Sequence, residues 1–266
     1  MPSSRMRFLY LSLIVSLPLA AGCNGGPADH GTANSSSSSE VRKEVEKPSV
    51  PVPEGKAVIA GRVVFEGTPP KPRRINFGPE KSCAELHAHA PLFTETLVVN
   101  PNGTVKWMLV CIKGKVPGKH KPPAEPVVMD QVGCVFIPHV AAMMAGQEVE
   151  FRNSDPFTHN VRVTPKLAAG SNLIFTNKAV RREVMGGAEL GIPIRCDIHF
   201  WMSAYLHVLS HPFFAVTGDD GSFLLNGVPP GTYTLQTWHE TLKPQTRTVT
   251  VQAGERKTVD FVFKND

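Results

Sequence analysis

Three residues in the second half of the chain stand at regular intervals in the segment IRCDIHFWMSAYLHV, residues 194–208. Cys196, His199 and Met202 supply a thiol, an imidazole and a thioether, with two residues between each and the next. A thiolate and an imidazole are good ligands for transition metals, and a thioether is a softer and weaker one. The segment is therefore either half of a metal site or a buried strand that carries sulfur and imidazole.

A second histidine precedes this segment. His159 lies 37 residues before Cys196, in VEFRNSDPFTHNVRV, after a turn-like Asn-Ser-Asp-Pro at residues 153–156 and before an alternating strand. One thiolate, two imidazoles and a weak axial thioether form the near-trigonal set that suits copper in both of its oxidation states. The order and separation of these residues resemble the cupredoxins, the blue-copper β-sandwiches, over about residues 95–210.

The cupredoxin resemblance implies a role for each residue. His159, Cys196 and His199 would be copper ligands, and Asn160 would hydrogen-bond the first ligand strand to the ligand loop without touching the metal. Met202 follows His199 more closely than the methionine of most blue-copper loops. Its spacing is that of the binuclear copper centre of cytochrome oxidase, which needs a second loop cysteine that this loop lacks. Met202 is therefore either the axial ligand or a core-filling residue.

Each of these residues also has a purely structural interpretation, and zinc is the chemical rival of copper. Cys196 alone would be read as an inert buried thiol. A Cys-His-His set with an open fourth position suits a catalytic zinc ion. Asp155 and Asp197 are the carboxylates near in sequence, but neither is obviously placed as a general base, and we expect Asp197 to cap the loop turn. We therefore favour copper over zinc hydrolysis.

The chain has five cysteines, at positions 23, 83, 111, 134 and 196. We predict a disulfide between Cys83 and Cys134, although sequence alone does not determine the pairing. Cys111 alternates with apolar neighbours in WMLVCIKG and is predicted to be a free, buried strand residue. Because the first residues of the chain predict export to an oxidising compartment, an unpaired Cys196 there favours a metal-bound thiolate.

The first residues predict export. Residues 1–22 contain two arginines, a short apolar run and a small-residue ending, which are the parts of a signal peptide. The ending LAAGC resembles the lipobox of bacterial lipoproteins, with Ala where Leu is usual, and implies a lipid on Cys23. Residues 23–56 are rich in Gly, Ser and Pro and are predicted to be a disordered tether. We expect a periplasmic or cell-surface protein anchored to a membrane.

The body of the chain is predicted to be all-β. Short runs rich in Val, Ile and Phe are separated by Gly, Pro and Asn from residue 57 onward. We assign residues 57–210 to a cupredoxin-like Greek-key sandwich. Within it, residues 165–190 hold few strand formers in a row and are predicted to be a loop-rich excursion.

The last part, residues 211–266, has cleaner alternation and regular turns. VTGDDGSFLLNGVPPGTYTL resembles the carboxypeptidase regulatory-like family of small transthyretin-type β-sandwiches. Such modules begin with an I-x-G-x-V strand, and VIAGRVVFEG within residues 57–67 could supply it from far upstream. The family implies a spacer or interaction module, sometimes one that binds carbohydrate, and no catalysis.

Charge and the remaining motifs exclude several classes. The net charge of +5 falls to +3 without residues 1–22, and the basic residues are scattered, so nucleic-acid binding is not indicated. No phosphate loop, Ser-His-Asp order or dinucleotide fingerprint occurs. His87 and His89 in CAELHAHA are predicted to be solvated loop residues. His139 is predicted to lie in the core or to reach the metal site from a neighbouring strand.

The sequence thus predicts an exported, lipid-anchored copper-binding protein that carries single electrons to or from a redox partner protein. Copper storage or delivery would use the same residues. The alternative is a β-sandwich binding or structural module, which recognises carbohydrate or protein and has no redox role. We do not predict an enzyme, because a multicopper oxidase would need further His-x-His pairs and HAHA is the sole candidate.

Overall fold

The structure is a computed structural model that describes residues 51–265. The predicted signal peptide, the predicted lipid site at Cys23 and the tether up to residue 50 lie outside the described residues. The described part consists of β-strands and one short helix, α1 (Lys81–Leu86), which confirms the all-β prediction. None of the helical structure in residues 51–265 is long and apolar enough to cross a bilayer.

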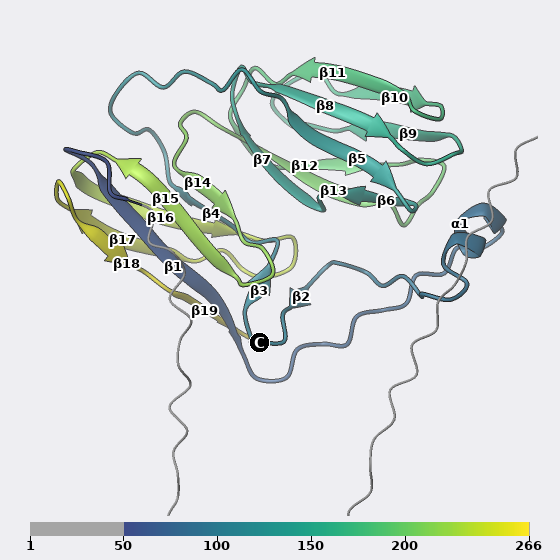
Figure 1. The fold of residues 1–266 in the computed structure, drawn as a ribbon, viewed down its shortest axis with the longest axis horizontal. Coiled ribbons are helices and arrows are strands. Elements are labelled where there is room, and N and C mark those ends of the chain that lie inside the picture. Colours follow the sequence, from purple (N-terminus) through teal and green to yellow (C-terminus); the bar gives the residue numbers. More distant parts are fainter. Residues whose placement is uncertain (1–50, 266) are drawn as a thin grey trace, which may run out of the picture. The chain divides into compact units, whose positions relative to one another are not determined.

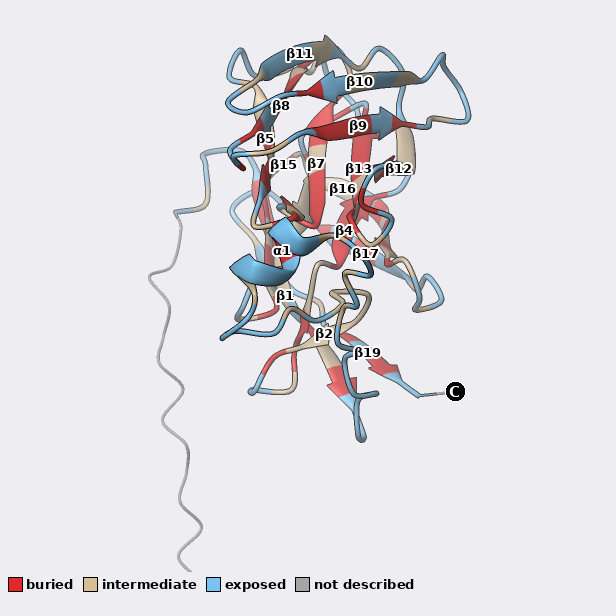
Figure 2. Cartoon of the chain, turned by 90° about the vertical axis from the view of Figure 1, so that its right-hand side faces the viewer, coloured by how far each residue is buried: buried red, intermediate tan, exposed pale blue. Residues whose placement is uncertain are grey.

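The first lobe is a sandwich of two sheets (Figure 1). Its strands are β5 (Val127–Val132), β6 (Val135–Ile137), β7 (Val140–Met144), β8 (Glu148–Asn153), β9 (His159–Val163), β10 (Ser171–Phe175), β11 (Val180–Val184), β12 (Glu189–Arg195) and β13 (Ser203–Leu209). One sheet has the order β10-β9-β12-β13-β7, and the other has the order β11-β8-β5-β6. Their inner faces share one core, in which Phe151 and Phe175 are fully buried. Figure 2 shows buried positions along β7 and β13 and the exposed surface of α1.

The predicted loop excursion at residues 165–190 is wrong. This range contains β10, which pairs with β9, and β11, which pairs with β8. Both are edge strands whose outward side chains include exposed apolar residues, with Ile174 70% and Val184 61% accessible. The alternation of apolar and polar residues in these two strands is therefore weak. Their extended conformation is stabilised by backbone pairing with β9 and β8.

The C-terminal lobe is assembled from two distant parts of the chain. Its strands are β1 (Ala57–Glu66), β2 (Val98–Val99), β3 (Val105–Lys106), β4 (Leu109–Ile112), β14 (Phe214–Val216), β15 (Ser222–Val228), β16 (Gly231–Trp238), β17 (Thr246–Val251), β18 (Arg256–Thr258) and β19 (Phe261–Lys264). β1 pairs with β15, β18 and β19, so the upstream strand completes the C-terminal sheet.

The predicted range of the first lobe, 57–210, needs correction at its start. β4 lies between β14 and β16, and Val110 and Ile112 pack in the same core as Phe223 and Phe261. Residues 57–66 and 98–112 therefore belong to the C-terminal lobe, and the first lobe spans residues 127–209. Residues 67–97 connect β1 to β2 through α1.

At Gly61, β1 lies against the backbone of the link between β18 and β19. A Cβ atom there would lie 1.8 Å from the backbone oxygen of Val259. We expect Gly61→Ala to lower the free energy of unfolding by about 1–3 kcal/mol, because backbone has to shift to admit the methyl group. Urea unfolding measures this. Gly218→Ala is the control, since no atom lies within 4 Å of its Cβ position. Equal stability of the two variants would show that β1 is not packed in this sheet.

Candidate metal centre

The backbone of β9 directs His159 into the core of the first lobe. Side chains two residues apart share one face of a strand, and Val161 and Val163 both pack in that core. His159 stands at the start of the same face and is fully buried. The preceding turn is held by Asn153, whose Nδ2 donates to the carbonyl oxygen of Phe157 at 2.8 Å. The predicted turn at residues 153–156 therefore sets where β9 begins.

The second half of the site is the loop between β12 and β13. The backbone N–H of Cys196 donates to the carbonyl oxygen of Met202 at 3.2 Å, and the N–H of Met202 donates to that of His199 at 2.8 Å. The Sγ of Cys196 lies 3.4 Å from the N–H of His199 and 3.5 Å from the N–H of Asn160. These contacts close the loop and point the sulfur inward.

The structure brings His159, Cys196 and His199 together. Their metal-binding atoms all lie within 4.8 Å of one another, and all three residues are buried. The two Nδ1 atoms are 2.8 Å apart, and Cys196 Sγ is 3.7 Å from His199 Nδ1. Bonds of about 2.0 Å to imidazole and 2.3 Å to thiolate separate neighbouring ligand atoms by about 3 to 4 Å. The donor set and its spacing therefore fit one transition-metal ion.

Electrostatics prepares the sulfur as a thiolate. Burial opposes ionisation of Cys196, but hydrogen bonds from His159, His199 and two backbone N–H groups outweigh it and lower the pKa to about 6. Burial likewise disfavours protonated His159, yet Asp155 and Cys196 raise its pKa. The thiolate is the form that binds metal.

Asp155 has a role that the sequence pattern does not predict, as the hydrogen-bond partner of His159. Its Oδ2 accepts a hydrogen bond from His159 Nε2 at 2.8 Å, which leaves His159 Nδ1 facing the other donors. The backbone N–H groups of Gly133 and Cys134 also donate to this carboxylate, at 2.6 and 2.8 Å. Burial opposes its charge, but these bonds lower the pKa of Asp155. A carboxylate on the far nitrogen of a ligand histidine fixes the ring, and its position four residues before His159 was the available signal.

Asn160 lies where the cupredoxin resemblance places it. Its Oδ1 accepts from the N–H of Asp197 at 2.6 Å, so it joins β9 to the ligand loop. Asp197 does not cap the loop turn as predicted. Its carboxylate instead accepts from Asn160 and Asn172 and pairs with Arg162 at 2.9 Å. Strands β9 and β10 thus hold the loop from outside.

Met202 and Trp201 complete the loop. Met202 is fully buried in the core of the first lobe, and its axial role stays a prediction. Trp201 Nε1 donates to the carbonyl oxygen of Cys134 at 3.0 Å, and its ring lies 5.2 Å from that of His199. Trp201 is therefore a packing residue beside the site.

Within residues 51–265, the other cysteines and histidines lie outside the set formed by His159, Cys196 and His199. Cys83 and Cys134 form a disulfide, and Cys111 is free and buried in β4. His139 does not reach the metal donors, because its Nε2 lies 2.6 Å from a Glu240 carboxylate oxygen. His87 is not merely solvated, since its Nε2 donates to the carbonyl oxygen of Gly133. His89 is exposed as predicted.

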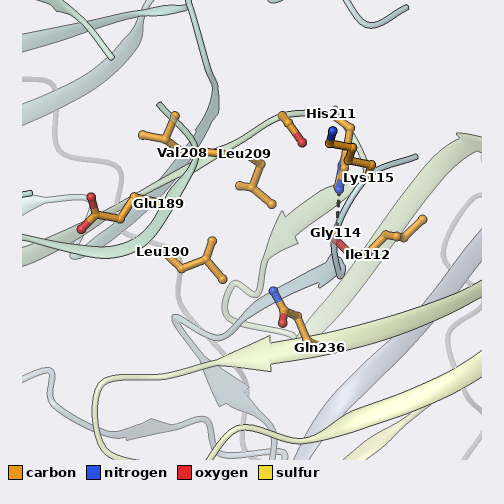
Figure 3. A pocket seen from close by; sticks show the side chains of 11 residues that line it. Ile112, Gly114, Lys115, Glu189, Leu190, Val208, Leu209, His211 and Gln236 are labelled. Carbon is orange, nitrogen blue, oxygen red and sulfur yellow. Dashed lines mark hydrogen bonds between the residues drawn. The ribbon is translucent and has the colours of Figure 1, made fainter. Parts of the chain in front are cut away.

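A cavity of about 280 Å³ lies between strands of the two lobes (Figure 3). Its wall combines apolar and polar side chains, among them Ile112, Leu190, Leu209, Lys115, Glu189 and Gln236. The ring of His211 at its edge donates to the carbonyl oxygen of Ile112 at 3.0 Å. His159, Cys196 and His199 do not line this cavity, so it is separate from the candidate metal centre.

Comparison with known proteins returns both families that the sequence resembles. Residues 208–264 match the family model of the carboxypeptidase regulatory-like domain, which confirms that prediction for the C-terminal lobe. No curated protein matches the chain.

Solved cupredoxin structures resemble part of the chain. The Cu-containing nitrite reductase of Thermus scotoductus SA-01 is 22% identical with a TM-score of 0.28, and the match covers 33% of this chain and 25% of that one. An oxidised mutant of amicyanin is 16% identical with a TM-score of 0.29, over 35% and 96% of the two chains. A purple cupredoxin from Nitrosopumilus maritimus is 15% identical with a TM-score of 0.27, over 31% and 98%.

The two free cysteines of the described residues should titrate far apart. Burial raises the pKa of Cys111 to about 11, despite a hydrogen bond from Gln236, whereas that of Cys196 is about 6. In a metal-free Cys23→Ser chain, we expect one thiolate to form as the pH rises through about 6, seen by ultraviolet absorption. Cys196→Ser should abolish this step and Cys111→Ser should keep it. A first step near the ordinary thiol value of about 8.5 would contradict the geometry.

Asp155→Asn should weaken metal binding by about 10- to 100-fold, because the charge that orients His159 and increases its basicity is lost. Competition with a chelator of known affinity measures the change. Asp130→Asn is the matched control, since Asp130 accepts hydrogen bonds from Ser154 in the same turn without contacting a ligand. Equal affinities for the two variants would assign Asp155 a structural role only.

Proposed function

We propose that this protein is an exported, membrane-anchored copper protein that carries single electrons. The observation that supports it is the buried convergence of His159, Cys196 and His199 from β9 and the β12–β13 loop. Bound copper would supply a one-electron couple, which thiolate and imidazole ligands suit in both oxidation states. We propose Met202 as the axial ligand, in keeping with its burial at the end of the ligand loop.

The chain's own residues hold the donors in place before a metal arrives. Asp155 fixes the His159 ring, and the backbone N–H groups of Asn160 and His199 point at the Cys196 sulfur. Asn160 ties the loop to β9. A site held this way changes little when the charge on the metal changes, as an electron carrier requires.

The carboxylates near the site favour a carrier over a zinc hydrolase. A zinc hydrolase needs a general base within reach of a metal-bound water. Asp155 already accepts three hydrogen bonds, from His159, Gly133 and Cys134. Asp197 is occupied by Arg162 and two asparagines on the outer side of the loop. Neither carboxylate is placed to serve as that base.

Export and anchoring are proposed from the signal-like residues 1–22 and from Cys23. The Cys83–Cys134 disulfide supports them, because disulfides persist in oxidising compartments. We propose a redox partner protein for the metal lobe and a carbohydrate or protein contact for the C-terminal lobe. The match of residues 208–264 to the carboxypeptidase regulatory-like model supports that second contact.

The runner-up is a binding or structural module without redox activity. The observation that favours it is the same family-model match at residues 208–264. In that case the C-terminal lobe would carry the function, and the first lobe would bind no metal.

Copper titration of the full chain, followed by visible absorption, tests the proposed function. We expect an intense thiolate-to-copper band that saturates at one copper per chain. Cys196→Ser and His159→Ala should abolish it, because each removes a ligand. Cys111→Ser should leave it unchanged, since that buried thiol lies in β4 of the other lobe.

Two outcomes of this titration would overturn the proposal. A colourless chain that takes up zinc tightly would indicate a zinc site, and a chain that binds neither metal would indicate the structural module. Voltammetry of the loaded chain separates a carrier from a store. A reversible one-electron wave supports electron transfer, whereas loss of copper on reduction indicates storage or delivery.

A further inference from the structure

The connection between β1 and β2, residues 67–97, lies against the candidate metal centre, and we call it the cover segment. Two backbone hydrogen bonds close its base, from Ile75 to Leu92 and from Thr94 to Arg73. Helix α1 stands at its far end (Figure 1). The segment is therefore a long loop. Beyond its base, its position depends on the contacts made by α1 and the residues next to it.

The cover segment is attached mainly by a covalent bond. Cys83 is its one buried residue, and every other residue of α1 is exposed. Cys83 forms the disulfide with Cys134, in the turn between β5 and β6, and His87 Nε2 donates to the carbonyl oxygen of Gly133 at 2.8 Å. A segment that buries so little apolar surface opens easily unless it is linked.

The tip of the cover segment closes the outer edge of His199. Glu80 Oε2 lies 3.9 Å from His199 Nε2, and the His199 side chain is only 4% exposed. The Phe77 ring packs edge-on against Trp201 at 5.2 Å, and Trp201 in turn lies against His199. The side of His199 that faces away from the ligands is therefore covered by residues 77–80.

The same arrangement gives each histidine of the ligand set a carboxylate neighbour. Asp155 contacts Nε2 of His159 from within the first lobe. Glu80 lies near Nε2 of His199, but it belongs to the cover segment and not to the first lobe. Cys134 joins the two sides, because its backbone N–H donates to Asp155 and its carbonyl oxygen accepts from Trp201.

We propose that the cover segment is a disulfide-held gate over the metal centre, with Glu80 as a positioning residue for His199. A dithiol reductant opens it: the dithiol becomes a disulfide, and Cys83 and Cys134 each gain one hydrogen. With the link broken, residues 77–87 move away and expose His199 to solvent and to a metal acceptor. This proposal rests on the proposed function in one respect, which is that His159, Cys196 and His199 bind a metal.

Hydrogen exchange of the metal-free full chain tests the gate without any metal. The Cys83→Ser/Cys134→Ser double variant should exchange amides in residues 196–203 about tenfold faster than the wild type, since local opening controls their exchange. Amides of β16, in the other lobe, should not change. Cys111→Ser is the control for loss of a buried sulfur. Unchanged exchange at residues 196–203 would overturn the gate.

Metal release from the loaded full chain gives the second readout. The double variant should lose copper to a chelator about tenfold faster or more, and Glu80→Gln should weaken binding by about tenfold without altering exchange. Glu85→Gln, an exposed position on α1, is the matched control for Glu80. Equal release rates for wild type and double variant would overturn the gate. A chain that binds no metal would contradict the proposed function instead, and the hydrogen-exchange experiment would then test the gate alone.

Discussion

The first lobe is organised around two imidazoles and one thiol placed within 2.8 to 3.7 Å of their neighbours in a buried site. Polar atoms in such a place need partners, because burial without a partner costs free energy. Asp155 partners the outer nitrogen of His159, and backbone N–H groups partner the Cys196 sulfur. The raised pKa of His159 and the lowered pKa of Cys196 express the same coupling, an imidazolium-like ring beside a thiolate.

The C-terminal lobe also supports the ligand loop. His139 bridges the two lobes, with its Nε2 2.6 Å from Glu240 and its Nδ1 3.0 Å from the carbonyl oxygen of Ser203, the residue after Met202. The ring of Trp238 packs edge-on against His207 on the neighbouring β13. The lobe that matches the carboxypeptidase regulatory-like model is therefore in contact with β13, which follows the ligand loop. Through His139, Glu240 is linked to Ser203 at the start of that strand.

Much of the site could be predicted from residue types and spacing, because transition-metal chemistry restricts the ligand set to few side chains. Residue type and spacing predict His159, Cys196 and His199 as the donors, and the structure brings them together. The sequence offers Asp155 only as a carboxylate near the site, without a partner. Its hydrogen bond to His159 depends on the turn that Asn153 shapes, which the sequence shows only as a turn-like run.

The sequence by itself determined the β character of the chain, the three donors and the likeness of the last residues to a small sandwich, since these depend on local alternation and side-chain chemistry. Tertiary structure decided the rest. Whether β4 joins β14 and β16 or the first lobe, and whether residues 171–184 form edge strands, depends on pairing between distant segments. Glu80 lies 3.9 Å from His199, in a segment that the disulfide between Cys83 and Cys134, 51 positions apart, links to the first lobe. Such contacts follow from the whole fold, because the residues of a strand or a cysteine do not determine which distant segment it pairs with.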